Sequence, residues 1–308
     1  MPEGSGAIRI ISRIDISEAK WDSLVQKSDN SIFMSRWYLD AVMPNWKALV
    51  FNDYQACLPV FISRKYGLKY CLQPLFIREC SVLGDKSKFQ DFLIKLQGET
   101  SFFSLAMDID VNHKNIIREH AIHQVLTLNQ EYESVYKMYS QNVKRSLRDF
   151  IKSKAELTDE QDSALLIKMF RDLKGKQFSH IDDDAYFRLS DLMKNAKSMN
   201  ASILRGVRLN GELVAICCFI RQNGKLLYLK GIVDSRGRDI GAMQAVFDSV
   251  IKENAYSALT LDFGGSNNKG LALFNKKFGA IDRKYLILKY NGVSWPLRSF
   301  VNGKIGLK

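Results

Sequence analysis

The most constraining stretch of the sequence runs from residue 201 to residue 280, where short apolar runs alternate with glycine-containing turns. Asn210-Gly211 separates the first two runs, and Asn223-Gly224 separates the second run from the third. Both central residues of the favoured two-residue turn need a positive φ, which Asn and Gly adopt readily, so each Asn-Gly pair predicts a β-hairpin. We therefore expect an antiparallel meander of three strands over residues 201–232.

A loop with two arginines and two glycines follows this meander, with the sequence Asp234-Ser-Arg-Gly-Arg-Asp-Ile-Gly241. Apolar residues at helical spacing come next, which places the loop at a helix N-terminus. Free backbone N–H groups and the helix dipole make such a place suited to a phosphate or pyrophosphate, and arginines add charged donors. The residues expected to bind a phosphate or pyrophosphate are Arg236, Gly237, Arg238, Ile240 and Gly241.

A predicted strand over residues 259–262 leads into a Phe-Gly-Gly turn and a second short helix that ends near Phe278. Three antiparallel strands, an anion-binding loop, a helix and a returning strand form the element order of the GNAT acyltransferases, which this region resembles. Within that superfamily the likeness is to the FemAB-like branch, which holds the FemABX peptidyltransferases and related acetyltransferases. The residues that carry it are Asp262, Phe263, Gly264, Gly265, Phe274, Lys276, Phe278 and Gly279.

The resemblance implies an N-acyltransferase that takes an acyl group from acyl-CoA, or an amino acid from aminoacyl-tRNA, and places it on an amine. The acceptor would be a peptidoglycan precursor or a small metabolite. It implies no tightly bound cofactor, because the acyl donor is a co-substrate. It also implies that Lys276 acts at the oxyanion or the leaving group. The alternative for Lys276 is a surface lysine on a short helix.

Transfer to an amine also requires a route for the proton that the amine loses. Asp262 could orient the amine or accept this proton, or it could instead cap the Gly-Gly turn that follows it. Tyr228 and Tyr139 are candidate proton donors, although a buried tyrosine is usually a core residue with one satisfied hydroxyl.

An amphipathic helix is predicted over residues 131–152, and its second half is basic. The FemAB-like family resembles this segment too, in an asparagine followed by basic residues at the start of its second domain. We expect contacts with phosphates of the substrate or the acyl carrier from Tyr139, Asn142, Arg145 and Arg148. The alternative is a solvated helix face, which is what a run of charges usually forms.

The first part of the chain repeats the element order of the second: a strand, two helices, a three-run meander, a helix and a strand. We infer an internal duplication and an α/β fold of two tandem GNAT-like domains, with mixed, largely antiparallel sheets flanked by helices. The expected domains are residues 1–121 and residues 122–308. The second is expected to carry the acyl-donor site, because the first lacks the Arg-Gly-Arg loop.

The 308 residues carry a formal net charge of +12, which favours anionic partners such as nucleotides, tRNA or acidic surfaces; we expect no DNA partner. The five cysteines and four histidines show no metal-ligand spacing, so we expect no metal site. No run is long and apolar enough to span a membrane, and the first residues do not resemble a signal peptide, so we expect a cytoplasmic protein. Nothing in the sequence indicates an oligomeric state.

A rival hypothesis belongs to a different class of protein. It is a catalytically silent GNAT-like module whose basic surface binds RNA or an acidic partner. Two departures from the family pattern favour it. Met243 stands where the loop signature ends in a small residue, and Asn275 stands directly after Phe274, where several members have the lysine.

Overall fold

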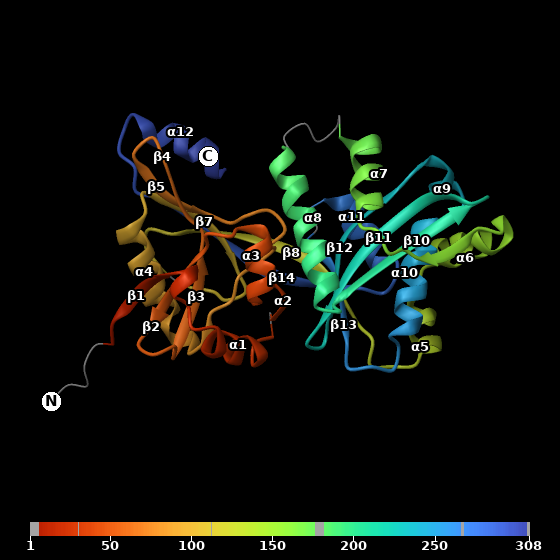
Figure 1. Ribbon diagram of the computed structural model, residues 1–308, viewed down its shortest axis with the longest axis horizontal. Helices are drawn as coiled ribbons and strands as arrows, with labels where there is room; N and C mark the ends of the chain where they lie inside the picture. The colour runs from red at the N-terminus through yellow and green to blue at the C-terminus, as the bar shows by residue number, and fades with distance from the viewer. Residues whose placement is uncertain (1–5, 30, 112, 176–181, 266–267, 307–308) are drawn as a thin grey trace. The chain divides into compact units, whose positions relative to one another are not determined.

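The chain forms two compact units in a computed structural model that describes residues 6–29, 31–111, 113–175, 182–265 and 268–306 (Figure 1). The first unit comprises residues 1–121 and 284–308, and the second comprises residues 122–283. The segment 284–308 thus belongs to the first unit, which differs from the expected division that places it in the second domain. The physical reason is strand pairing, because residues 286–291 pair antiparallel with residues 102–107.

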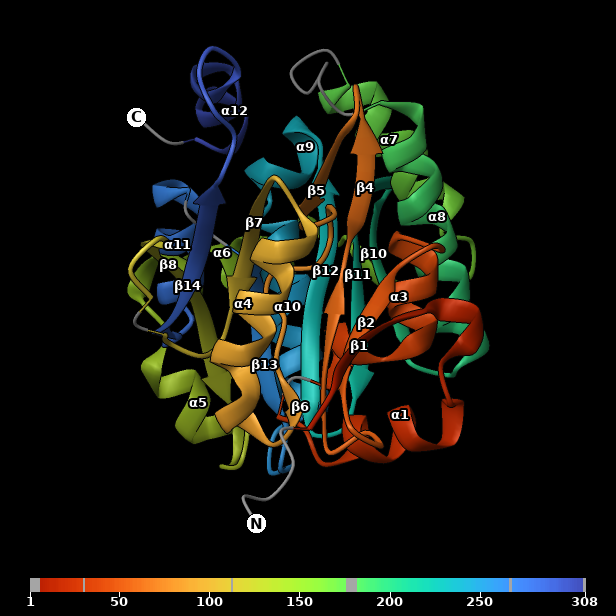
Figure 2. The same cartoon turned by 90° about the vertical axis from the view of Figure 1, so that its left-hand side faces the viewer.

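The first unit contains two sheets, seen face-on in Figure 2. The strand order of one is β1-β2-β3-β6, and the order within the other is β4-β5-β7-β14. The strands are β1 (Ile8–Ser12), β2 (Lys47–Phe51), β3 (Ala56–Val60), β4 (Ile62–Lys65), β5 (Leu68–Leu72), β6 (Leu83–Gly84), β7 (Phe102–Met107) and β14 (Ile281–Asn291). The helices are η1 (Arg13–Asp15), α1 (Glu18–Gln26), α2 (Ser31–Met34), α3 (Arg36–Val42), η2 (Lys86–Lys88), α4 (Phe89–Glu99) and α12 (Leu297–Ile305).

The second unit is built on the strand order β8-β13-β12-β11-β10-β9. Its strands are β8 (Ile117–Thr127), β9 (Glu156–Asp159), β10 (Ser202–Leu209), β11 (Glu212–Gln222), β12 (Lys225–Val233) and β13 (Thr260–Gly265). The predicted meander is confirmed, because β10 pairs antiparallel with β11 and β11 with β12. Both residues of each Asn-Gly turn have a positive φ, as the turn chemistry requires.

Helices lie against this sheet from both sides (Figure 1). They are α5 (Tyr132–Met138), α6 (Gln141–Ser153), α7 (Ala164–Lys174), α8 (Asp183–Ser198), α9 (Ser235–Asp239), α10 (Ala242–Glu253) and α11 (Lys269–Lys276). Phe247 of α10 is buried at the centre of a core to which α5, α6 and α11 also contribute. On the other side Phe170 of α7 lies 4.1 Å from the Lys230 ammonium.

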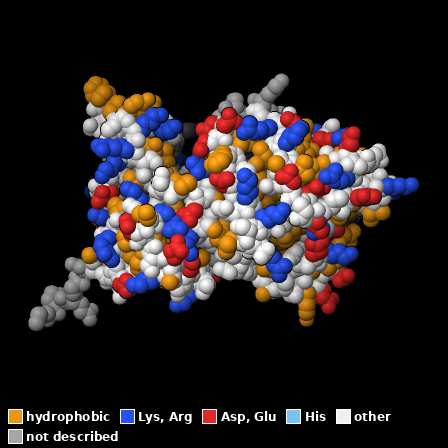
Figure 3. Space-filling view, in the orientation of Figure 1, with side chains coloured by type: hydrophobic (Ala, Val, Ile, Leu, Met, Phe, Trp, Pro, Cys, Tyr) orange, Lys and Arg blue, Asp and Glu red, His pale blue; other side chains and the backbone are white. Residues whose placement is uncertain are grey.

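The helix expected over residues 131–152 is two helices, which corrects that expectation. Tyr139 has an extended backbone, and the Ser140 hydroxyl accepts a hydrogen bond from the Val143 N–H, which starts α6 as a new helix. Lys and Arg side chains occur over both units on the face that Figure 3 shows. None of the helices in the described ranges combines the length and the apolar character that crossing a bilayer requires.

Candidate functional site

Strands β12 and β13 run parallel but separate after a short pairing. Only three residue pairs join them, and the last is Leu227 with Asp262. Beyond this pair β12 continues to Val233, and no described strand pairs with that edge of it. Gly264 lies at the separation with a φ of +78°, and a Cβ there would come within 3.0 Å of the Tyr228 carbonyl oxygen. The backbone groups of β12 beyond Leu227 therefore have no ladder partner among the described strands on the β13 side.

The predicted phosphate loop forms the one-turn helix α9 and the entry to α10. Its own amides are occupied, because Gly237 N–H donates to the Asp234 carboxylate at 2.8 Å and Gly241 N–H donates to the Arg238 carbonyl at 3.2 Å. The first-turn amides of α10, residues 242–244, have no acceptor among the described residues. Such amides carry the positive end of the helix dipole. The amides without a described acceptor therefore lie just after the residues that the sequence predicts, and Ala242 among them is fully buried.

The two arginines of this loop are exposed and differ in their partners. Arg236 is paired with Asp234 at 2.9 Å and with Glu212. The hydrogen bonds that Arg236 donates to Glu212 and then to Asp234 raise the Arg236 pKa. The side chain of Arg238 donates one described hydrogen bond, from Nη1 to the Val233 carbonyl at 3.2 Å. Arg238 is consequently the arginine that can turn to a ligand without losing a carboxylate partner.

The loop's small and apolar residues fill packing positions. Gly237 is buried, and a Cβ there would come within 2.7 Å of the Val214 carbonyl oxygen. Gly241 has a φ of +74°, and a Cβ there would lie 2.6 Å from the Ser146 carbonyl oxygen of α6. Ile240 packs on the core that contains Phe247. These three residues shape the entry to α10, and the close approach of α6 depends on Gly241.

Helix α6 brings its predicted substrate residues to this region, since Ser146 contacts Gly241. Asn142, Arg145 and Arg148 are exposed on α6, and neither arginine has a carboxylate partner in the described ranges. Their exposure leaves open whether they contact a substrate or form a solvated face. Tyr139 is different, because its ring is buried edge-to-face on Phe278 at 5.2 Å. Burial raises its pKa, and this position favours a core role for Tyr139.

Asp262 is buried within β13, where the pairing with β8 is irregular between Asp262 and Gly265. Its Oδ1 accepts a hydrogen bond from the Gly264 N–H at 2.9 Å. The same carboxylate also lies 3.3 Å from Nδ1 of His123, which is buried on β8 opposite Gly265. A carboxylate in this position orients an imidazole. The site thus holds a buried His–Asp pair beside the separation of β12 and β13.

Sequence reasoning did not identify His123. It lies 139 residues from Asp262 in the chain, and only the pairing of β8 with β13 brings the two together. No local motif marks the histidine. Tyr228, which was identified, packs between Phe219 and Phe247, and burial raises its pKa well above the usual tyrosine range. A phenol with a raised pKa also gives up its proton less readily, so burial weighs against Tyr228 both as a base and as a proton donor and favours a core role.

Lys276 projects from the exposed side of α11 and forms an ion pair with Asp282 at 2.6 Å. Asn275 is buried, and its Nδ2 donates to Gln124 Oε1 on β8 at 3.0 Å. Gln124 in turn donates to Asp282 at 2.9 Å. Hydrogen bonds from Lys276 and Gln124 lower the Asp282 pKa. Asn275, directly after Phe274, therefore faces the interior of the unit, whereas Lys276 lies on its surface.

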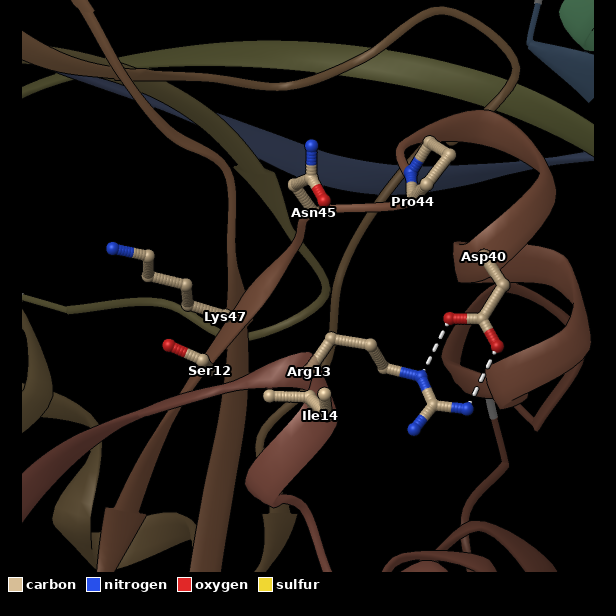
Figure 4. A pocket seen from close by; sticks show the side chains of 7 residues that line it. All are labelled: Ser12, Arg13, Ile14, Asp40, Pro44, Asn45 and Lys47. Carbon is tan, nitrogen blue, oxygen red and sulfur yellow. Dashed lines mark hydrogen bonds and ion pairs between the residues drawn. The ribbon is translucent and has the colours of Figure 1, made fainter.

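Two cavities are lined by described residues. One of about 400 Å³ lies between α7 and β11 and touches the phosphate loop only at Asp234. The other, of about 570 Å³, belongs to the first unit and is shown in Figure 4, where Arg13 makes two hydrogen bonds to Asp40. Neither contains a predicted catalytic residue. No group of three potential metal ligands occurs in the described part of the chain.

A family model described as an acetyltransferase (GNAT) domain matches residues 137–269. Among solved structures, the chain is similar to the crystal structure of FemX at 12% identity and a TM-score of 0.64, covering 96% of this chain and 99% of that one. It is similar to L-PGS from Bacillus licheniformis at 12% identity and a TM-score of 0.55, covering 94% and 96%. It is also similar to a tandem GNAT protein from the clavulanic acid biosynthesis pathway, at 9% identity and a TM-score of 0.54, covering 94% of this chain and 99% of that one. No curated protein matches the sequence.

Proposed function

We propose that the chain is an N-acyltransferase of the GNAT superfamily whose second unit binds the acyl donor. Residues 137–269 match a GNAT acetyltransferase domain, and the fold is similar to that of FemX and of a tandem GNAT protein. The observation that carries the proposal is the separation of β12 from β13 next to the α10 N-terminus. The edge of β12 beyond Leu227, which has no ladder partner among the described strands, can hydrogen-bond an extended amide-containing chain, and the amides of residues 242–244 can bind its phosphates. These are the two parts of a CoA thioester that need binding.

The donor is acyl-CoA or aminoacyl-tRNA, and different features support each. The α10 amides with Arg238 support a pyrophosphate of CoA. The net charge of +12 and the exposed arginines of α6 support a larger polyanion such as tRNA. For the acceptor we propose the amine of a peptidoglycan precursor or of a small metabolite in the cytoplasm, because FemX is among the similar structures.

We propose His123 as the base of the transfer. The acceptor nitrogen attacks the carbonyl carbon of the donor, the bond to the leaving sulfur or oxygen breaks, and the proton of the amine passes to an imidazole nitrogen. Asp262 holds Nδ1 of His123 and orients the imidazole for this transfer. Lys276 remains the candidate for the oxyanion or the leaving group, and it would have to leave Asp282 to act there.

A ligand titration distinguishes the donors. If CoA is the donor carrier, CoA or acetyl-CoA at a hundred times its dissociation constant stabilises the protein by about 2.7 kcal/mol, which a thermal-shift assay detects. If aminoacyl-tRNA is the donor, charged tRNA binds with an affinity that falls steeply with salt, and CoA has no effect. RNA binding without transfer to any amine in a panel would instead support the catalytically silent module.

The assignment of the base is tested with His123→Gln and Asp262→Asn. Each should lower the transfer rate by about 10²- to 10⁴-fold, the usual contribution of a general base, while leaving donor affinity unchanged. His120→Gln is the matched control, because His120 lies three residues earlier on the same strand and is exposed. Full activity of His123→Gln would refute the assignment of His123 as the base. Full activity of Lys276→Ala would refute the role of Lys276 at the oxyanion or the leaving group.

A further inference from the structure

The C-terminal helix of the first unit presents apolar side chains to solvent. Val301 and Ile305 of α12 are buried against a cluster that includes β5 residues, so the helix is held in place. Leu297 and Phe300 of the same helix are 52% and 73% exposed, and Trp295 just before the helix is 84% exposed. Three large apolar side chains within six residues are thus exposed, although Val301 and Ile305 of the helix are packed.

The tip of the β4–β5 hairpin lies at the same end of this unit as α12 (Figures 1 and 2). Tyr66 at the tip is 89% exposed. The Lys65 ammonium lies 5.3 Å from its ring centroid. Figure 3 shows hydrophobic side chains at this end with Lys and Arg side chains next to them. We call Tyr66, Trp295, Leu297 and Phe300 the aromatic patch.

The segments that carry the aromatic patch contain cations and no acids. Residues 54–78 and 283–308 include no Asp or Glu. Within the parts of the chain that the structure describes, no carboxylate is paired with the exposed cations next to the patch, which are Arg64, Lys65, Arg298 and Lys304. On α12 Lys304 follows Phe300 by four residues and Leu297 by seven, so all three share one face. The patch therefore combines exposed aromatic rings with uncompensated positive charge.

We propose that the aromatic patch docks the protein on the surface of an anionic lipid bilayer. Trp and Tyr rings prefer the level of the lipid headgroups, and Leu and Phe on one helix face enter the boundary with the acyl chains. The four cations then lie where anionic headgroups attract them. Single-stranded nucleic acid, the other partner of aromatic and basic surfaces, stacks its bases on rings along a groove, and an aliphatic Leu297 beside Phe300 offers no such platform.

The protein carries a natural probe for this docking. Trp21 and Trp46 are fully buried and Trp37 is partly buried, whereas Trp295 is exposed. Vesicles of phosphatidylcholine with phosphatidylglycerol should shift the tryptophan emission of the full chain to shorter wavelength and sediment the protein. Vesicles of phosphatidylcholine alone should do neither, and added salt should weaken the effect.

Variants locate the contact. Phe300→Asp and Leu297→Asp change exposed side chains, so the fold should be retained, and each should weaken vesicle binding at least tenfold. Removing one cation, by Arg298→Gln or Lys304→Gln, should weaken it about fivefold. Phe187→Asp, which changes an exposed aromatic residue on α8 of the second unit, is the matched control and should bind as the unmodified chain does.

Three results would overturn the proposal. The first is binding that Phe300→Asp and Leu297→Asp leave unchanged, or no binding to anionic vesicles. The second is that the unmodified chain binds tRNA but not vesicles, and that these variants lose the tRNA binding. The third is a dimer of the unmodified chain that Phe300→Asp converts to a monomer, which would assign the patch to a second copy.

Discussion

Gln244 offers a direct test of the α10 N-terminus as the anion site. It lies in the first turn of α10 and is half-buried. Gln244→Glu adds a negative charge where the helix dipole favours one, so the free energy of unfolding should rise by about 0.3–1 kcal/mol. The same negative charge would repel a bound phosphate. The change therefore predicts opposite effects on stability and on donor affinity.

The size of the repulsion follows from the helix geometry. A phosphate that accepts the N–H groups of residues 242–244 would lie about one helical turn, roughly 5.4 Å, from the new carboxylate. Two unit charges at that separation repel by about 3 kcal/mol at an effective dielectric constant of about 20. Screening at physiological salt, with a Debye length of about 8 Å, halves this to roughly 1.5 kcal/mol. Donor affinity should thus fall about tenfold.

The measurement is titration calorimetry with CoA on the unmodified chain and two variants. Gln90→Glu is the matched control, because Gln90 is exposed in the first turn of α4 in the first unit and undergoes the same chemical change. Only Gln244→Glu should weaken binding, and the loss should shrink at high salt. Equal affinities of the two variants would refute a phosphate site at α10.

Three other predictions concern the fold. Gly241→Ala should destabilise the protein by about 2–4 kcal/mol in denaturant titration, because a left-handed backbone costs about 1 kcal/mol and the Ser146 contact adds overpacking. Gly211→Ala is the control, because Gly211 also has a positive φ but lies in open space, so this change should cost only the backbone contribution. Equal losses of stability in the two variants would contradict the contact with Ser146. Burial raises the Asp248 pKa, so the folded protein favours the neutral carboxyl, and the stability that this group contributes is lost as pH rises through that pKa. Asp248→Asn should therefore raise the melting temperature more at neutral pH than near pH 4. An effect that does not depend on pH would argue against the raised pKa. Burial raises the pKa of Cys57 to about 12, and all five cysteines are free and buried, so a thiol reagent should label them only in denaturant.

The parts of the fold that local chemistry dictates were predictable from the sequence. The two Asn-Gly pairs define the meander because few other dipeptides accept two positive φ values. The apolar spacing through Phe247 places α10 correctly, since each of those residues is needed to cover the sheet. Family likeness then supplied the tandem fold class, which the family model and the similar structures bear out.

Contacts between distant segments were not predictable in the same way. The C-terminal segment joins the first unit through the pairing of β14 with β7, which no turn signal announces. The break between α5 and α6 depends on Ser140 capping a new helix within a continuous apolar pattern. His123 meets Asp262 because β8 lies beside β13, and a strand's neighbour is a property of the sheet. Local patterns carry no information on such neighbours.

Lys276 and Asn275 show how a one-residue difference on a helix changes the chemistry that a motif can perform. Successive residues on a helix point about 100° apart, so only one of the two can face the interior after Phe274. Asn275 takes that direction and binds Gln124, whereas Lys276 pairs with Asp282 on the surface. A neutral amide carries no positive charge, so the inward position of α11 lacks the cation that the lysine would offer to an oxyanion or a leaving group. We therefore place the proton transfer on the His123–Asp262 pair, which is buried on neighbouring strands.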